Sequence, residues 1–330
     1  MRLEEKPPSW KTDPEWRLTL SIDPGEFPHR LPPFRIEYAS GGLMRLVTGG
    51  RPILWARPRQ YWQGVWLLAP DTSRERPALP LPPLSSDTIR TIRGKPRSAA
   101  WFSQWARVFV RGLTESSSTV LHEGSWELTS GSSPGPSRPT SSRDAYGVID
   151  LGRGPGRPGQ VYESWALNGS GALVAARGSS ADDAGRVKAF RKRARDGTLP
   201  PALLLFVSGL DLWVILDGHD RLRAAAIEGV PLPWVKLCPI REVTYDPDER
   251  MRAAVLRNSN TALAQGGSEP GPALDKINER LVRAFSDARF VVSKTRAAPI
   301  PGGSERWIRE VQEQLALIGP SADRAILPGS

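Results

Sequence analysis

Five consecutive residues, Asp217-Gly218-His219-Asp220-Arg221, place two carboxylates, an imidazole and a guanidinium around one glycine, and Arg223 follows two positions later. Arginine donates charge-assisted, often bidentate hydrogen bonds to phosphate oxygens, and histidine titrates near neutral pH. Gly218 permits a positive φ and allows a ligand to approach the backbone closely. This combination predicts a site for an anionic, phosphate-bearing ligand.

The same side chains allow further chemistry and also plain structural roles. Asp217 and Asp220 are oxygen ligands of the kind that Mg²⁺ prefers, and His219 can donate a proton to a phosphate or move one during a reaction. Alternatively, Asp220 is an N-cap, Arg223 belongs to an exposed helix face, and His219 is a hydrogen-bonded surface group. The surroundings of these side chains decide between the two interpretations.

The elements that position this segment are a strand hairpin and a helix. Two apolar runs precede it, Ala202–Val207 and Leu212–Leu216. Neither run alternates with polar residues, which is typical of central strands covered on both faces. A helix then begins at Asp220 or Arg221, and Gly229 is placed to end it at C′. The first turn of such a helix presents unpaired backbone N–H groups and a partial positive charge, which favours an anion.

Further elements are predicted on both sides of this hairpin and helix. Upstream, Val161–Leu167 and Ala172–Ala176 flank Asn168-Gly169, which is a strong hairpin signal. A helix with a capping-box-like start is predicted from about Ala181 to Arg195, and its basic face is either a solvated surface or a phosphate-binding one. Downstream, Val230–Leu237 returns as a strand.

Composition limits the class of protein. A single cysteine, Cys238, excludes a disulfide framework and a multi-cysteine metal site, which is typical of a reducing compartment. Met1–Trp10 lacks the apolar segment of an ordinary secretory signal, and no apolar run reaches the ~20 residues of a membrane span. We therefore expect a cytoplasmic protein with no membrane partner. The formal net charge of +10 favours an anionic partner: a nucleotide, nucleic acid or an acidic protein.

The first part of the chain has a β-rich pattern. Short alternating runs extend from Trp16 to about Thr129, and each is closed by Gly or Pro. Within them, Ala106–Leu113 and Ser118–Leu128 are predicted to be paired strands. Most of the 12 tryptophans lie in this part and are expected to form its core rather than a ligand-binding wall.

Two segments rich in Ser, Pro and Gly, Ser130–Arg143 and Gly152–Gly159, predict linkers and a boundary near residue 150. The pattern beyond Asp246 is helical, and Trp307–Ile318 predicts a last amphipathic helix. The sequence therefore predicts an α+β protein of three parts: a β-rich domain over 1–150, an α/β domain over 151–245 and a helical extension over 246–330.

Residues 160 to 240 resemble the ParB/sulfiredoxin superfamily. The resemblance rests on the strand and loop Leu212–Arg221, on Arg223 with the two alanines after it, and on Gly229 with the strand that follows. The upstream helix Val187–Arg195 and the strand Leu203–Val207 fit the order of that fold. The resemblance implies a ParB/sulfiredoxin-like α/β domain between the β-rich domain and the helices.

Departures from the superfamily's patterns separate its known activities. Sulfiredoxins carry a catalytic cysteine where this chain has His219, and Cys238 lies beyond the helix, so sulfinic acid reduction is not expected. CTP-binding ParB proteins have a Gly-Glu-Arg-Arg-x-Arg loop, of which this chain keeps Arg221 and Arg223 but has Asp220 in place of one arginine. The helix-turn-helix DNA reader expected downstream in those proteins is also not evident.

The best local match is to ParB-like free-serine kinases, whose Asp-Gly-His-x-Arg loop matches Asp217, Gly218, His219 and Arg221. This resemblance implies that a nucleoside di- or triphosphate (ATP, ADP or CTP) binds with Mg²⁺. The nucleotide would be bound by four residues, Gly218, Asp220, Arg221 and Arg223, and the two arginines would hold its phosphates. His219 would stabilise the transferred group, and Asp217 would position His219 or the metal.

The general base of these kinases is a glutamate upstream of the loop. Its candidate here is Glu163, with Asp182 and Asp183 behind it.

Three hypotheses of function follow. The first is a nucleotide-phosphate-binding protein, and one version of this hypothesis is an ATP- or ADP-dependent phosphotransferase. The second is a DNA-binding protein or nuclease, favoured by the positive charge and by the nuclease activity attributed to some ParB-like domains. The third is a non-catalytic protein-interaction or immunity module, in which the β-rich part makes the contact.

Overall fold

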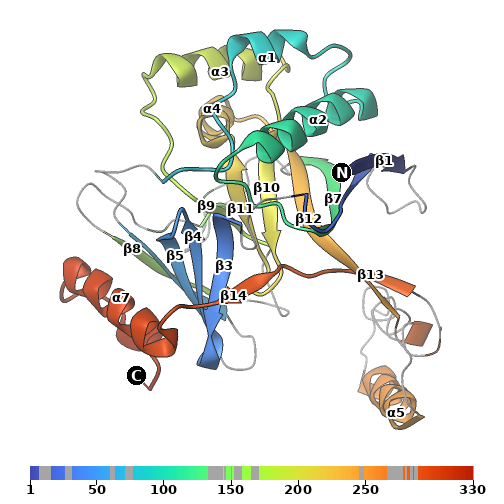
Figure 1. Ribbon diagram of the computed structural model, residues 1–330, viewed down its shortest axis with the longest axis vertical. Coiled ribbons are helices and arrows are strands. Elements are labelled where there is room, and N and C mark those ends of the chain that lie inside the picture. Colours follow the sequence, from blue (N-terminus) through green and yellow to red (C-terminus); the bar gives the residue numbers. More distant parts are fainter. Residues whose placement is uncertain are drawn as a thin grey trace. The chain divides into compact units, whose positions relative to one another are not determined.

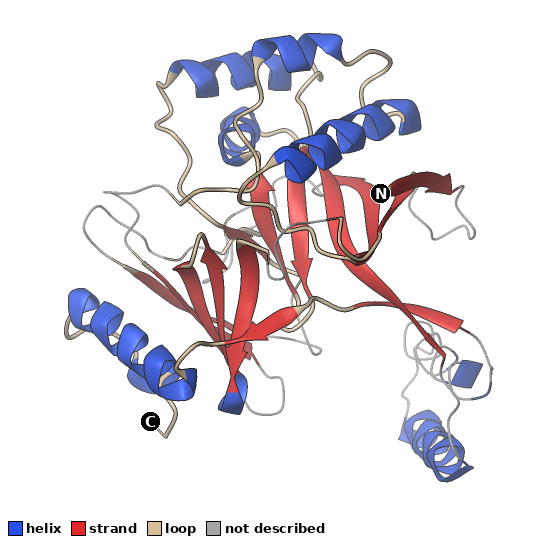
Figure 2. Ribbon diagram, in the orientation of Figure 1, coloured by secondary structure: helices blue, strands red, loops and turns tan. Residues whose placement is uncertain are grey.

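The computed structural model of the chain mixes helices and strands throughout, which confirms the predicted α+β class (Figure 1, Figure 2). It describes residues 1–6, 16–26, 32–59, 64–70, 77–132, 144, 146–149, 151, 158–164, 171–244, 249–265, 278, 281–282, 285 and 289–329. The chain forms two compact units, one of Met1–Pro239 with Lys294–Ser330 and one of Ile240–Ser293. The Asp217–Arg221 segment belongs to the first unit.

An eight-stranded sheet positions this segment. Its order is β1-β2-β7-β12-β10-β11-β9, and β13 (Arg289–Ser293) pairs with the end of β12. The other strands are β1 (Arg2–Lys6), β2 (Arg17–Ile22), β7 (Gly124–Ser132), β9 (Leu173–Ala175), β10 (Ala202–Val207), β11 (Leu212–Asp217) and β12 (Pro233–Thr244). β10 and β11 form an antiparallel hairpin, whereas β9 with β11 and β10 with β12 are parallel pairs.

Both faces of β10 and β11 are covered, as their apolar sequences predicted. On one face, Leu204 and Ile215 pack with α3 (Gly185–Arg195) and α4 (His219–Glu228), which lie next to each other above the hairpin in Figure 1. α1 (Ser86–Thr91) also contributes to this cluster. On the other face, Leu203 and Leu216 join the largest core cluster of the described residues.

A second sheet of six strands, in the order β14-β3-β4-β5-β6-β8, shares that largest core. Its strands are β3 (Phe34–Ala39), β4 (Leu43–Thr48), β5 (Arg51–Pro58), β6 (Gly64–Ala69), β8 (Gly159–Ser164) and β14 (Ala297–Pro299). A short 3-10 helix, η1 (Ser40–Gly42), joins β3 to β4. α2 (Ala99–Glu115) packs into the same core through Trp105 and Phe109.

The predicted boundary near residue 150 does not separate the two sheets. β1, β2 and β7 from before it join β9 to β12, while β8 and β14 from after it join β3 to β6. Each sheet therefore contains strands from both halves of the chain. The apolar faces of the two sheets bury one another in one core. The predicted helical extension likewise contains β13 and β14 besides α5 (Glu249–Gln265) and α7 (Gly303–Ile318). Most of the predicted linkers, 133–143 and 152–157, lies outside the described residues.

Two local predictions in the sequence were wrong. The predicted strand Ala106–Leu113 is part of α2, whose buried side chains recur at helical spacing from Trp101 onward, and Ser98 caps its start. The predicted hairpin around Asn168-Gly169 does not form, because β8 pairs with β6 and β9 pairs with β11 in the other sheet. The Asn-Gly pair itself lies outside the described residues.

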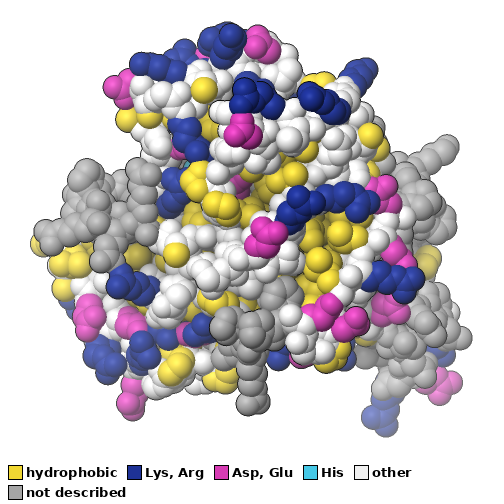
Figure 3. Space-filling model, turned by 45° about the horizontal axis from the view of Figure 1, so that its top comes forward, with side chains coloured by type: hydrophobic (Ala, Val, Ile, Leu, Met, Phe, Trp, Pro, Cys, Tyr) yellow, Lys and Arg dark blue, Asp and Glu magenta, His cyan; other side chains and the backbone are white. Residues whose placement is uncertain are grey.

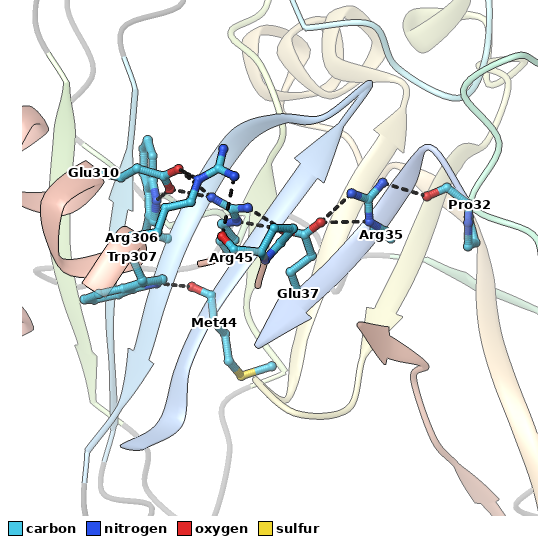
Figure 4. Close-up of polar contacts among 10 residues, drawn as sticks. Pro32, Arg35, Glu37, Met44, Arg45, Arg306, Trp307 and Glu310 are labelled. Carbon is cyan, nitrogen blue, oxygen red and sulfur yellow. Dashed lines mark hydrogen bonds and ion pairs between the residues drawn. The ribbon is translucent and has the colours of Figure 1, made fainter. Parts of the chain in front are cut away.

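A buried ion-pair network joins α7 to the six-stranded sheet (Figure 4). The Arg45 side chain on β4 is 2% exposed, and it donates to Glu37 on β3 at 2.7 Å and to Glu310 on α7 at 2.6 Å. Nearby, Trp307 Nε1 donates to the Met44 carbonyl at 2.8 Å. Because a buried charge is tolerated only when it is paired and hydrogen-bonded, this network fixes where α7 docks.

Candidate functional site

Gly218 links β11 to α4, and Gly229 ends α4, both as predicted. Gly218 has φ +110°, and Gly229 has φ +65° in the left-handed region. A Cβ added to Gly218 would lie 2.6 Å from the Ala202 Cβ and 2.9 Å from its Cα. The close backbone approach that the sequence predicted for a ligand is therefore made by the first residue of β10, and glycine is required both by conformation and by packing.

Arg221 is the buried centre of the site. It is 1% exposed, and its Nη2 donates to Asp217 Oδ2 at 2.5 Å. The guanidinium carbon lies 5.8 Å from the centre of the Phe190 ring on α3. The Nε and Nη1 atoms of Arg221 are buried and have no hydrogen-bond partner among the described residues. A guanidinium has five N–H donors, so Arg221 has unused donating capacity inside the site.

A pocket of about 200 Å³ opens beside Asp217. Arg177 and Leu216 line it on the side of the site. The opposite wall comes from the segment between β6 and α1, through Pro77, Leu79, Leu81 and Pro83. Leu79 and Leu81 also pack against the main core, so the wall is anchored. The pocket thus combines a carboxylate and a guanidinium with a rigid apolar surface.

His219 is buried rather than a surface group. It is 3% exposed, and its Nε2 accepts a hydrogen bond from the Arg177 backbone N–H at 3.4 Å. His219 therefore positions the chain at Arg177, one of the residues that line the pocket.

Asp220 secures the loop before α3 and is not the N-cap of α4, since that position is Gly218. Its Oδ1 accepts from the Ser180 backbone N–H at 2.8 Å, and its Oδ2 accepts from Arg186 Nε at 3.0 Å. Burial alone would raise the pKa of Asp220, but the hydrogen bonds from Ser180 and the charges of Arg177 and Arg186 outweigh burial and lower it. Asp220 is a structural support of the site.

Asp220→Asn is expected to lower the free energy of unfolding by about 2 kcal/mol at pH 7, because a buried carboxylate with charge-assisted hydrogen bonds is lost. Since the folded-state pKa of Asp220 is lowered, its stabilisation is fully present above the unfolded pKa of about 3.9 and is lost as pH falls through the folded value. Urea unfolding of the wild type and of Asp220→Asn, at pH 7 and at pH 3, measures the loss of stability and its dependence on pH. A difference between the two proteins that does not shrink in acid would contradict the assignment.

Arg223 lies on the exposed face of α4, as its structural interpretation predicted. Its Nε and Nη2 donate to Asp182 at 2.5 and 2.7 Å, and both side chains are about half exposed. These hydrogen bonds, donated by Arg223 and accepted by Asp182, raise the pKa of Arg223 and lower the pKa of Asp182. The structure therefore does not bring Arg223 to the buried site, and it pairs Asp182, a candidate base, with that arginine. Asp183 is exposed.

Glu163, the first candidate for a general base, is buried on β8 of the six-stranded sheet, opposite Val65 of β6. Asp217 ends β11 of the eight-stranded sheet. Glu163 therefore lies on a different sheet from the loop that it was predicted to serve.

Half of the basic residues of α3 are paired with carboxylates of the protein, namely Arg186, Arg191 and Arg195. Arg191 and Arg195 both donate to Glu228 of α4, at 2.6 and 2.8 Å, which lowers the pKa of Glu228. Lys188 and Lys192 remain exposed. Figure 3 shows Lys and Arg side chains spread over the helices α1 to α4 and interspersed with Asp and Glu. Much of this charge holds α3 and α4 together.

α3 begins at Gly185 rather than at Ala181, since the Ser180 N–H is bound to Asp220.

Metal and thiol chemistry find little support in the described part of the chain. No group of three His, Cys, Asp or Glu side chains is arranged there to hold a metal ion. Asp217, the predicted Mg²⁺ ligand, is paired with Arg221. Burial raises the pKa of the Cys238 thiol to about 12, so this cysteine is not a reactive thiolate.

Comparisons with protein-family models, with curated proteins and with solved structures found no match. Among the described residues, no helix has both the length and the hydropathy needed to cross a membrane. The interpretation of the site therefore depends on its own geometry.

Proposed function

We propose that the Asp217–Arg221 site binds a phosphate group of a nucleoside di- or triphosphate. The observation that carries the proposal is the buried guanidinium of Arg221, which has Nε and Nη1 without hydrogen-bond partners among the described residues. A buried donor without a partner costs about 1–3 kcal/mol, and more when it is charged. A phosphate oxygen would satisfy these donors with charge-assisted hydrogen bonds.

The start of α4 supports an anion at the same place. Leu222 N–H donates to the Gly218 carbonyl at 2.8 Å as the first bond of the helix. This bond marks the N-terminal end of α4, where the helix dipole favours negative charge. Arg177, held by His219, adds a second guanidinium at the neighbouring pocket.

The Pro- and Leu-lined wall of that pocket favours a ligand that has a flat apolar part in addition to its anionic group. Prolines and leucines give a surface on which a nucleobase can pack, while Arg177 lines the same pocket and Arg221 bonds Asp217 at its edge. The resemblance of residues 160 to 240 to nucleotide-binding ParB-like proteins points to the same class of ligand.

Mg²⁺ fits this proposal only as an ion carried by the phosphates. Mg²⁺ commonly keeps several waters and is held by one or two carboxylates together with substrate phosphates. Asp217 is the one carboxylate that lines the pocket among the described residues. It would be the protein's ligand to such an ion, at the expense of its bond to Arg221.

The proposal concerns binding and not phosphoryl transfer. Transfer needs a group that positions the acceptor for in-line attack. Asp217 and Asp220 are bound to arginines, and Glu163 lies on the other sheet. Within the described residues, the geometry supports a proposal of phosphate binding alone.

Arg221→Lys is expected to weaken nucleotide binding at least tenfold, because lysine keeps the charge but loses the planar fork that contacts phosphate. Isothermal titration calorimetry with ATP, ADP and CTP, each with and without Mg²⁺, measures the dissociation constants. Arg223→Gln is the matched control, because the Arg223 guanidinium is exposed and paired with Asp182. The nucleotide affinity of this variant should stay within about threefold of that of the wild type.

A second variant keeps the test independent of folding. Arg177→Gln alters a side chain at the pocket without touching the buried Asp217–Arg221 pair, and it should also weaken binding. Circular dichroism verifies that each variant is folded. Absence of saturable binding by every nucleotide at millimolar concentration, or equal affinities of wild type and Arg221→Lys, would overturn the proposal.

A further inference from the structure

A second pocket in the first unit, separate from the one at Asp217, lies where the six-stranded sheet meets the turn of the β10–β11 hairpin. Its volume is about 680 Å³, within the range of about 300–1,000 Å³ typical of small-molecule sites. It is lined by η1, by parts of β3, β4 and β5, by the hairpin turn and by Lys294, Thr295 and Ala297. None of its described lining residues is shared with the pocket beside Asp217.

The walls of this pocket are tied to one another. Ser208 N–H donates to Thr295 Oγ1, and Thr295 N–H donates to Ser208 Oγ, each at 2.9 Å. Thr295 Oγ1 also donates to the Phe206 carbonyl at 3.2 Å. On the opposite side, Ile300 N–H donates to the Tyr38 carbonyl at 2.9 Å. These bonds hold the hairpin turn, β3 and β14 in place, so the pocket is formed without a ligand.

The interior of the pocket is mainly apolar. Its apolar lining consists of Ile36, Ala39, Met44, Pro58 and Ala297. Tyr38 also lines the pocket, and this aromatic residue is 50% exposed. Such a surface favours an apolar, preferably flat, ligand body.

The rim of the pocket is positively charged. Arg59 and Lys294 are both exposed, and neither forms an ion pair with another described residue. No Asp or Glu is found among the described residues that line the pocket. Because no acidic side chain faces them in the pocket, these two cations provide a positive potential that attracts an anion.

We propose that this pocket binds a small amphipathic organic anion, an aromatic or aliphatic body that carries one acidic group. The body would pack on the apolar floor and against Tyr38, and the acidic group would lie between Arg59 and Lys294. The hydroxyl groups of Ser40, Ser208 and Thr295 line the pocket and offer additional hydrogen bonds. This site is independent of nucleotide binding at Arg221.

Two fluorescent probes with the same ring system test the charge requirement. 8-Anilinonaphthalene-1-sulfonate carries an acidic group, and N-phenyl-1-naphthylamine is the same body without it. We expect one saturable sulfonate site on the full-length protein, and the double variant Arg59→Gln, Lys294→Gln should bind this probe about tenfold more weakly, roughly threefold for each exposed charge. Its affinity for the neutral probe should not change. Tyr38→Ala should weaken the binding of both probes.

The control double variant Lys95→Gln, Arg309→Gln removes the same two charges at exposed positions that do not line the pocket, and it should bind both probes like wild type. The proposal is overturned if the sulfonate probe does not saturate, or if the Arg59→Gln, Lys294→Gln variant keeps wild-type affinity for it. Dimerisation on a gel-filtration column that Tyr38→Ala abolishes would also overturn it, because the surface would then be covered by a second copy of the chain.

Discussion

Glu310→Gln is expected to lower the free energy of unfolding by about 3 kcal/mol, because it breaks the buried network that joins α7 to the six-stranded sheet. Arg45 Nη1 donates to both carboxylate oxygens of Glu310 at 2.6 Å, and Trp55 Nε1 and Arg306 Nε donate to it at 3.0 and 2.8 Å. The variant leaves Arg45, 2% exposed, with Glu37 as its remaining carboxylate (Figure 4). A buried charge that loses a partner costs far more than the net gain of the pair.

The matched control is Glu313→Gln, the same chemical change on the exposed face of α7. Its effect should stay within about 0.5 kcal/mol. Urea unfolding at pH 7, followed by circular dichroism and by tryptophan fluorescence, measures both variants. Equal unfolding midpoints for Glu310→Gln and Glu313→Gln would contradict the role assigned to the network.

Acid should abolish the difference between wild type and Glu310→Gln. Burial alone would raise the pKa of Glu310, but the hydrogen bonds from Arg45, Trp55 and Arg306 outweigh it, and the pKa is lowered. Stabilisation by this carboxylate is therefore present above the ordinary glutamate pKa of about 4.3 and is lost as pH falls through the folded value. A gap between the two proteins that persists unchanged at pH 3 would indicate that packing, not charge, joins α7 to the sheet.

The elements that could be predicted from the sequence are those determined by their own residues. The uninterrupted apolar runs of β10 and β11, the glycine that ends α4 and the amphipathic pattern of α7 are local signals, and the structure has each of them. Local signals failed where a longer pattern or a distant partner decides. Ala106–Leu113 by itself fits a strand pattern, because the helical stripe becomes clear only when Trp101 and Trp105 are included.

Strand partners depend on contacts far apart in the sequence. β8 pairs with β6 of the same sheet, and β7 joins β2 of the other, although long segments separate each pair in the chain. The Asn168-Gly169 turn signal describes only the residues between two strands and cannot show that both strands have partners elsewhere. For the same reason, linker-like composition near residue 150 did not mark a division of the fold.

The candidate site shows the same division between local and distant information. The sequence predicted that Asp217 to Arg221 lie at a strand end and a helix start, with a positive φ at Gly218, and the structure agrees. It did not predict that Phe190 lies beside Arg221, or that residues 77–83 form the wall of the pocket. Those neighbours come from other elements, and only the packed structure brings them to the loop.

Gly218→Ala is expected to lower the free energy of unfolding by about 3 kcal/mol. The residue has φ +110°, outside the region that alanine adopts readily, which costs about 1–3 kcal/mol. The added methyl group would also lie 2.6 Å from the Ala202 Cβ and 2.9 Å from its Cα, so part of β10 must move. A Cβ there would also lie 3.0 Å from Arg221 Nη2, the nitrogen that bonds Asp217.

Gly229→Ala is a demanding control because it changes the glycine at the other end of the same helix. Gly229 also has a positive φ, +65°, but a Cβ there meets no atom within 4 Å. It should therefore cost about 1 kcal/mol, from backbone conformation alone. Chemical unfolding of the two variants separates conformational strain from the clash with β10. If both cost the same, the contact with Ala202 does not limit residue 218, and Gly218 would be required by its conformation alone.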